Sequence, residues 1–449
     1  MRDSSSGENH LLRALGLAFG VAVAFGAMIG AGILRTPGGV LNHLPSAPLA
    51  IGLWIFGAIH ALVGANVVSE LMTSVPRSGG LFVPARAAFG QTAGFLIGWS
   101  DWLNMVAAVA ALAIAAGEFS AIMIPRLRGD EALVGAMLIM MFFAINWRGV
   151  REGSRAQIAS SAAKGLFLII LVALILFLPN SPPPPAAPPP PLSRAAAPVS
   201  LLGALVAYQL IFGVYSGWPN AAYFAEEDVD PGRNIPRSMF LSILGVALLY
   251  LAINGALIHA VPIERLRESQ LPLALAVSAV LGPFSMKIIA AGAVLIVLGC
   301  LNANIMVGPR ILYGLARDGL FPKFATRIND GGTPGVALVI TIALSLLLTF
   351  TGSFEAIFLV MGAFAVFPML VADASLFKLR RSQPALRRPY RAIGYPVLPA
   401  IALALDFGLL VSFMVTDPMS GVSVVVAVAL CIPVAALAGR RRTRLVAEQ

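Results

Sequence analysis

A glycine-rich stretch inside an apolar segment is the first candidate site in this sequence. The segment covers about residues 12–34, and crossing a bilayer takes about 20 apolar residues. Its middle carries Gly26, Gly30 and Gly32, and each glycine costs roughly 1 kcal/mol relative to alanine inside a helix. In lipid, a helix break is tolerated only where it is buried in protein or lines a water-filled cavity. From this stretch alone, a binding site and close packing through small residues explain the glycines equally well.

A second apolar segment, at residues 200–224, repeats the interruption. Gly213 and Gly217 precede Pro219, which removes a backbone donor and bends a helix. A simple proline kink is the alternative explanation. However, two interrupted helices at corresponding positions of two five-helix halves indicate the binding site of an inverted-repeat transporter.

The two predicted breaks offer backbone groups that suit a zwitterion. N–H groups exposed at the start of a helix, here from Gly30 to Ile33, favour a carboxylate. Freed carbonyl oxygens suit an ammonium group. We expect these carbonyls at Ala27, Met28, Phe212 and Tyr215. An α-amino acid satisfies both ends, so we predict it as the substrate. The predicted substrate-binding residues are Ala27, Met28, Ile29, Gly30, Ala31, Gly32, Ile33, Phe212, Gly213, Tyr215, Ser216 and Gly217.

One lysine is expected deep in the bilayer. Lys164 lies well inside a predicted span at residues 156–178, and a charged side chain near the bilayer centre marks a functional site by default. A side chain that reaches back to the cytoplasmic face is the alternative, which this depth makes difficult. Because a buried amine can exchange protons, we predict a coupling role for Lys164.

The elements that carry these residues must be membrane helices. Of the 449 residues, 58% are hydrophobic and only 12% are charged, and the mean hydropathy is +0.87. These values exclude a soluble protein. We predict an all-α polytopic membrane protein with twelve transmembrane helices. The spans lie at about 12–34, 48–73, 93–124, 132–146, 156–178, 200–224, 239–261, 284–308, 335–352, 355–377, 396–416 and 420–438.

The basic residues predict the orientation. Most of the 31 lysine and arginine residues fall in segments that are cytoplasmic when the N-terminus is cytoplasmic, as the positive-inside rule requires. We therefore predict a multi-pass protein of the cytoplasmic membrane with both termini in the cytoplasm. The same asymmetry explains the net charge of +10 without a nucleic-acid partner. A basic loop at 378–395 could contact membrane lipid headgroups, although a topology signal is the simpler explanation.

The spans divide the chain into seven segments. We predict a cytoplasmic N-terminus at 1–11, a first repeat at 12–178, a proline-rich external loop at 179–199, a second repeat at 200–377, the basic loop at 378–395, two further helices at 396–438 and a cytoplasmic tail at 439–449. The proline-rich loop is predicted to be a stiff spacer rather than a recognition ligand.

Four motifs occur in order along the chain. They are Gly26-Ala27-Met28-Ile29-Gly30-Ala31-Gly32-Ile33 with Thr36-Pro37, Ser69-Glu70-Leu71 with Pro76-Arg77-Ser78-Gly79-Gly80, Tyr215-Ser216-Gly217-Trp218 with Glu226-Glu227 and the segment 231–236, and Leu301-Asn302-Ala303-Asn304 with the segment 310–319. Together they resemble the amino acid–polyamine–organocation permeases over about residues 11–330, in the branch that includes the L-type transporters and their bacterial relatives. The resemblance implies a LeuT-like 5+5 inverted repeat with helices 1 and 6 discontinuous, followed by two C-terminal helices.

The resemblance also bears on Lys164 and Gly213. Related permeases carry a lysine seven residues after a glutamine in the fifth helix, and Gln157 and Lys164 match that spacing. In that family the ammonium group lies where sodium-coupled relatives bind Na⁺, which implies sodium-independent transport. Where the family places a bulky aromatic gate, this sequence has Gly213. Either Phe212 or Tyr215 closes the site instead, or the pocket admits a larger side chain.

The remaining polar residues are given structural roles. Inside the spans they are predicted to hydrogen-bond neighbouring helices rather than substrate, and they are His60, Asn66, Asp101, Asn104 and Glu118. Glu226 and Glu227 are predicted to pair with basic inner loops. The scattered histidines suggest no metal site. No cofactor is implied, and no phosphate-binding glycine loop points to ATP.

These observations predict a secondary transporter rather than an enzyme. It is expected to move α-amino acids by alternating access without Na⁺, and either proton symport or exchange would drive it. A polyamine or organocation carrier is the alternative within transport, although it would be expected to place acidic residues at the breaks. A non-transporting amino acid sensor is the alternative from another class.

Overall fold

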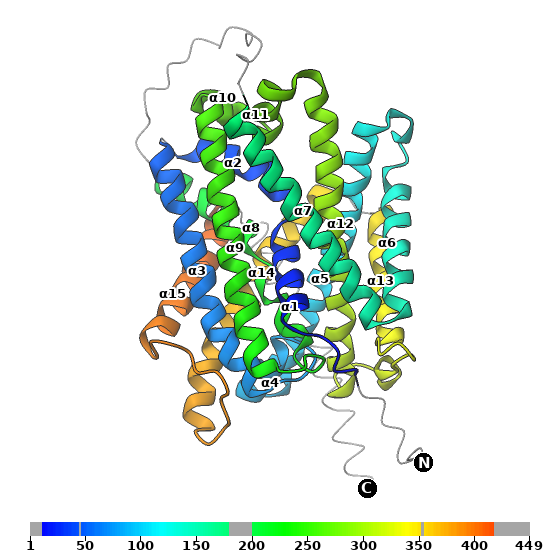
Figure 1. Cartoon of the computed structure of the whole chain (residues 1–449). Coiled ribbons are helices and arrows are strands. Elements are labelled where there is room, and N and C mark those ends of the chain that lie inside the picture. Colours follow the sequence, from blue (N-terminus) through cyan, green and yellow to red (C-terminus); the bar gives the residue numbers. More distant parts are fainter. Residues whose placement is uncertain (1–10, 45, 179–199, 352–353, 417–449) are drawn as a thin grey trace.

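All regular secondary structure in the described part of the chain is helical (Figure 1). The computed structural model describes residues 11–44, 46–178, 200–351 and 354–416. The helices are α1 (Leu17–Met28), α2 (Gly32–His43), α3 (Ala47–Ser74), α4 (Phe82–Phe89), α5 (Gln91–Met123), η1 (Pro125–Leu127), α6 (Glu131–Arg148), α7 (Val150–Phe177), α8 (Leu201–Tyr215), η2 (Trp218–Phe224), α9 (Pro231–Ala260), α10 (Ile263–Glu268), α11 (Pro272–Leu281), η3 (Gly282–Phe284), α12 (Ser285–Arg317), η4 (Lys323–Thr326), α13 (Gly335–Thr351), α14 (Phe354–Ser382) and α15 (Val397–Thr416).

Many of these helices are long and apolar enough to cross a bilayer. Within the described residues eight helices qualify, and the bent pair α1 and α2 adds a ninth. A polytopic helical membrane protein is therefore confirmed, whereas the predicted count of twelve spans is not. α13 is a shorter apolar helix of 17 residues. The last predicted span at 420–438, Cys431 and the proline-rich loop at 179–199 lie outside the described residues.

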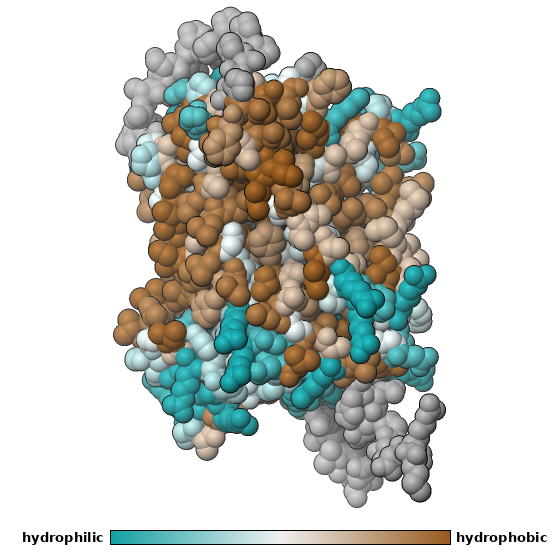
Figure 2. Space-filling view, viewed as in Figure 1, coloured by the Kyte–Doolittle hydropathy of each residue, from teal (hydrophilic) through white to brown (hydrophobic). Residues whose placement is uncertain are grey.

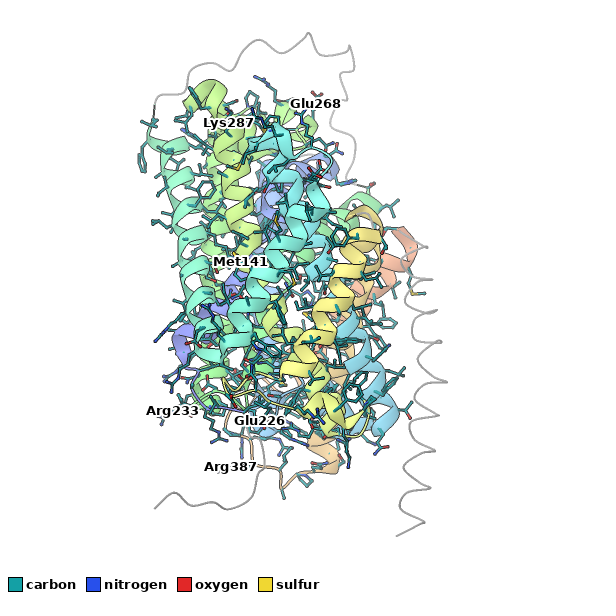
Figure 3. All side chains as sticks on the ribbon, turned by 90° about the vertical axis from the view of Figure 1, so that its right-hand side faces the viewer. Met141, Glu226, Arg233, Glu268, Lys287 and Arg387 are labelled. Carbon is teal, nitrogen blue, oxygen red and sulfur yellow. The ribbon has the colours of Figure 1, made fainter. Side chains whose placement is uncertain are left out.

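The surface of the bundle matches a bilayer. Hydrophobic side chains cover the middle of the molecule in Figure 2, and hydrophilic ones gather mainly at its lower end. Glu226, Arg233 and Arg387 lie at that lower end in Figure 3, and Glu268 and Lys287 lie at the opposite end. An apolar belt between two polar ends lets the helices meet lipid tails while the charges stay in water.

Two helix boundaries differ from the predicted spans. The first crossing continues as α2 to His43 instead of ending near residue 34, because Arg35 stays exposed and the helix accommodates Pro37. α7 begins at Val150 rather than near residue 156, so Lys164 lies at the middle of this 28-residue helix. The earlier start of the helix therefore makes an escape of the lysine to either membrane surface still harder.

Ion pairs fix the linker between η2 and α9 to the end of α12. Both oxygens of Glu227 bind the Arg310 guanidinium, at 2.5 and 2.8 Å, and both side chains are buried. Burial raises the pKa of Glu227, and the charge of Arg310 counteracts this effect. Glu226 pairs with Arg317 at 2.8 Å. The prediction that these glutamates pair with basic residues is confirmed, although the arginines belong to α12 instead of a loop. The lower ion-pair cluster consists of Arg77, Arg86, Glu226, Glu227, Arg310, Arg317 and Asp318.

Candidate functional site

The first membrane crossing is interrupted between α1 and α2. α1 ends at Met28 and α2 begins at Gly32, and the two helices are bent by 48°. The N–H groups of Ile33 and Leu34 bond to carbonyls just before them. In the described residues, the N–H groups of Ala31 and Gly32 have no backbone acceptor. Two donors at the start of α2 are therefore available to an anionic group.

A second interruption separates α8 from η2 and touches the first one. Gly217 lies between them with φ +111°, a conformation that L side chains rarely adopt. A Cβ atom added to Gly217 would lie 2.8 Å from the carbonyl carbon of Ala27. Glycine is thus required here both for its backbone angle and for the close approach of the two breaks.

Tyr250 on α9 joins the two breaks through its hydroxyl group. The hydroxyl lies 2.9 Å from the carbonyl oxygen of Met28 and 3.1 Å from that of Val214. The side chain is fully buried, and its ring packs edge-on against Tyr215 with the ring centres 5.3 Å apart. One tyrosine therefore holds the ends of α1 and α8 at a fixed separation. A single tyrosine in an apolar span gave no sequence signal for this role.

Lys164 binds the first break but does not line the cavity described below. Its ammonium group donates to the carbonyl oxygen of Gly26 and lies 3.0 Å from that of Ile29. The thiol of Cys300 donates to the same two oxygens, at 3.0 and 3.1 Å. Sulfur and nitrogen are 3.7 Å apart. The lysine is completely buried, so its charge is satisfied by the carbonyls that the break frees.

Two of the four carbonyls expected to bind an ammonium group already accept a backbone hydrogen bond, and a third, that of Ala27, lies 3.7 Å from the Cys300 sulfur. The carbonyl oxygen of Met28 accepts from the N–H of Gly30 at 3.0 Å, and it also lies close to the hydroxyl group of Tyr250. Phe212 accepts from the N–H of Ser216 at 2.9 Å, because helical turns continue to the end of α8. The breaks therefore do not leave these two carbonyls free, since the unwound part of the second crossing begins later than Phe212. Their contact with substrate stays a prediction.

A cavity of about 440 Å³ lies beside the two breaks. Ten of the twelve predicted binding residues line it, and they are Ala27, Met28, Gly30, Ala31, Gly32, Phe212, Gly213, Tyr215, Ser216 and Gly217. Ile29 and Ile33 do not line it and are fully buried, and Lys164 does not line it either. The structure thus brings together residues nearly 200 positions apart in the sequence, while their contact with substrate stays a prediction.

Gly213 leaves open space in the cavity wall. A Cβ atom added there would meet nothing within 4 Å. The neighbouring Phe212 ring lies against His60, with the ring centres 5.9 Å apart. Tyr215 lies against Trp54 at 6.1 Å. Both aromatic candidates for a gate are therefore packed against other side chains, and the missing aromatic at Gly213 enlarges the space next to the breaks.

Polar side chains from other helices also reach the cavity. Asp101 on α5 accepts a hydrogen bond from Tyr223 at 2.5 Å, as predicted for an interhelical contact, yet it lines the cavity as well. Asn104 lines it too, and its Oδ1 atom has no partner among the described residues. Asp406 on α15 is a cavity residue that the sequence reasoning missed. A carboxylate inside an apolar run was the available signal.

The fold and the site together define a class of protein. Two interrupted membrane helices that line one cavity are the arrangement used by secondary transporters, in which free backbone groups bind the substrate. The chain belongs to the amino acid permease family, since the profile of that family matches residues 15–437. The predicted family is confirmed, and with it the prediction that the chain is a transporter and not an enzyme.

Curated relatives agree with this membership. The chain is similar to the serine/threonine exchanger SteT of Bacillus subtilis, with 26% identity over 94% of this chain and 96% of the relative. It is 28% identical to the Asc-type amino acid transporter 1 of Mus musculus, over 93% and 79% of the two chains. It is also 28% identical to the large neutral amino acids transporter small subunit 2 of Homo sapiens, over 86% and 74%.

Proposed function

We propose that this permease moves α-amino acids across the cytoplasmic membrane by alternating access, with the substrate bound where the two breaks meet. The observation that carries this proposal is the cavity of about 440 Å³ beside both interrupted helices. The N–H groups of Ala31 and Gly32 are available there for the substrate carboxylate. The ammonium group of the substrate binds the carbonyl oxygen of Ala27, a cavity residue that lies next to Gly217.

The substrates are neutral amino acids, and the transport mode is exchange or proton symport without Na⁺. The relatives' names support this class, because they include a serine/threonine exchanger and a transporter of large neutral amino acids. The open space at Gly213 suits side chains larger than serine. Lys164 supports sodium independence, because its ammonium group already binds the carbonyls of Gly26 and Ile29 that a cation would otherwise need.

The topology proposed for this mechanism has twelve transmembrane helices. The first five span residues 12–178 and the next five residues 200–377, as inverted repeats, and two more helices occupy 396–438. Both termini are cytoplasmic in this arrangement. Its support is the position of the two breaks at the start of each repeat, together with the gathering of polar side chains at one end of the molecule (Figure 2).

A carrier of cationic substrates is the second candidate. The observation that favours it is that Asp101 and Asp406 line the cavity, although no acidic residue lies at the breaks themselves. Both carboxyl groups already have a contact, since Asp101 accepts from Tyr223 and Asp406 lies 3.0 Å from the His60 ring. Neutral amino acids therefore remain the first proposal.

Uptake by the purified protein in liposomes tests the proposal. Labelled neutral amino acids, cationic amino acids and a polyamine are compared under separate Na⁺ and proton gradients and with or without internal amino acid. We expect saturable uptake of a neutral amino acid that needs no Na⁺. Saturable binding without uptake or exchange would show a sensor instead, and uptake confined to polyamines would show the second candidate. A strict Na⁺ requirement would contradict the role given to Lys164.

A further inference from the structure

A cluster of buried ionisable side chains lies in the cavity wall away from the two breaks. We name it the His60 cluster, and it consists of His60 on α3, Tyr208 on α8, Asp373 on α14 and Asp406 on α15. None of the four is more than 8% exposed. His60, Tyr208 and Asp406 line the cavity itself, so water in the cavity can reach the cluster.

The cluster joins four helices through direct contacts. The Nδ1 atom of His60 lies 2.5 Å from the hydroxyl oxygen of Tyr208. On the other edge of the ring, Nε2 lies 3.0 Å from Oδ1 of Asp406. The carboxyl groups of Asp373 and Asp406 are within hydrogen-bonding reach of each other. A single chain of contacts therefore runs from α8 through α3 and α15 to α14.

Bound protons would complete this chain of contacts. Two carboxylates offer only acceptors, so Asp373 and Asp406 can hydrogen-bond to each other only when at least one of them carries a proton. The imidazole and the two carboxyl groups have no net charge only when they hold two protons beyond the N–H that the neutral ring already carries. A buried charge without a partner is costly, which favours that state. Loss of one proton leaves a net negative charge inside the bundle.

Within the part of the chain that the structure describes, no fixed positive charge offsets this cluster. In the described residues, no lysine or arginine lies within 4.0 Å of Asp373 or Asp406. Among the described residues, the other titratable side chains that line the cavity are Asp101, Tyr215, Tyr223 and Cys300. Tyr250 on α9 packs on Tyr215. Glu70, further along α3, is held by Arg380 and Arg388. Protonation is therefore the means by which the cluster can lower its charge.

The proton count also changes a hydrogen bond at the cavity. When Nδ1 of His60 carries a proton, it donates to Tyr208, whose own hydrogen must then turn elsewhere. When Nδ1 is bare, Tyr208 donates to it. Tyr208 lies on α8 one turn before Phe212, which also packs on His60. Adjacent Gln209 donates to Ser412 and Thr416 on α15, at 2.9 Å each.

We propose that the His60 cluster is a proton-binding site that controls how α8, the first half of the second interrupted crossing, docks on α3 and α15. With these two further protons the chain of contacts from α8 to α14 is complete. After deprotonation the carboxylates of Asp373 on α14 and Asp406 on α15 repel each other, which moves α15 and weakens the contacts of Gln209 on α8 with Ser412 and Thr416. The inference rests on the proposed transport function for its consequence, whereas proton binding itself can be measured without any substrate.

Infrared difference spectra between acidic and alkaline buffer test proton binding on the full-length protein in lipid nanodiscs. We expect the wild type to show a protonated-carboxyl component that is lost in Asp373→Asn and in Asp406→Asn. Asp101 is another buried carboxyl group and contributes a component of its own, so Asp101→Asn, the matched control, should keep the component that belongs to the cluster. The two cluster variants are independent, so one that does not fold leaves the other as the test.

The pH profile of amino acid exchange in liposomes tests the consequence. His60→Gln should shift the half-maximal pH by at least about one unit or flatten the profile. His259→Gln, an exposed histidine near the end of α9, should leave it unchanged. Absence of a protonated-carboxyl band in the wild type, or a band that both aspartate variants leave unchanged, would overturn the proton site. An unaltered profile in His60→Gln would overturn its control of α8. The expected band in a protein that transports no amino acid would support the site and refute the proposed function instead.

Discussion

Gly217 is a residue at which the two interrupted crossings touch. Alanine there would place a methyl group 2.8 Å from the Ala27 carbonyl carbon, on a backbone with φ +111°. We expect Gly217→Ala to lower uptake at least tenfold by pushing the breaks apart. Gly213→Ala is the control, because its methyl group meets nothing within 4 Å and should leave uptake within about twofold of wild type. Equal uptake by both variants in liposomes would contradict the required close approach.

Lys164 stabilises the first break by donating to two carbonyl oxygens. Methionine has a similar length but no donor, so Lys164→Met leaves these buried carbonyls without their strongest partner. A buried group that loses its partner costs about 1–3 kcal/mol. We therefore expect a lower melting temperature in detergent and slower uptake. Lys287→Met, at an exposed position (Figure 3), should change neither measurement. If Lys164→Met transports like wild type at every pH, the lysine has a structural role only and the predicted coupling role is wrong.

At the residue scale, sequence reasoning succeeded where a residue breaks a local rule. Glycines inside a membrane span and a lysine at its middle are costly, so they stand out without a structure. Tyr250 and Cys300 break no such rule, because aromatic and thiol side chains are ordinary in apolar spans. Their contacts with Met28 and Gly26 depend on how distant helices pack, which spacing along the chain does not encode.

The linker after η2 is held to α12 by a buried ion pair, and its loss has a predictable cost. Removing one partner of a buried pair destabilises a protein by about 3–5 kcal/mol. Glu227→Gln should therefore lower the free energy of unfolding strongly, because Arg310 is only 2% exposed. The control is Asp230→Asn, whose partner Arg233 lies 3.9 Å away in an exposed pair. Unfolding measured in detergent should not respond to that control. A Glu227→Gln protein as stable as wild type would contradict this account of the lower ion-pair cluster.

At the element scale, apolar runs located the helices, while their ends were predicted less well. Apolar length alone ended the first crossing before Arg35, yet α2 continues to His43 because that arginine faces outward. The same reasoning ended the eighth span near residue 308, whereas α12 runs to Arg317 and buries Arg310 against Glu227. A charged residue need not end a helix when an oppositely charged side chain pairs with it. Such a partner comes from another part of the chain, as Glu227 does for Arg310.

The whole molecule has one predicted orientation in the membrane. Single cysteines are placed at Lys287 and at Arg387, which lie at opposite ends in Figure 3, in a background without Cys300 and Cys431. A membrane-impermeant thiol reagent should label position 287 in intact cells and position 387 only after permeabilisation. The reverse pattern would place the termini outside, and labelling of both positions in intact cells would contradict the proposed topology.

At the scale of the whole molecule, composition alone established a polytopic helical protein, and the paired breaks predicted which parts meet. The cavity itself was beyond prediction, because residues such as Asp406 reach it from a helix that follows both proposed repeats. Sequence patterns describe one helix at a time. A cavity belongs to the space that several helices leave between them.

Substrate protection of a cysteine at Gly213 is the most direct test of where the substrate binds. Gly213 lines the cavity and has free space around it, so Gly213→Cys, in a transporting background without Cys300 and Cys431, reports occupation of that space. A transported amino acid should slow thiol labelling of this cysteine. The concentration that gives half of the maximal protection should equal the concentration that half-saturates uptake. Labelling that proceeds unchanged at saturating substrate, while uptake is saturated, would contradict binding between the two breaks.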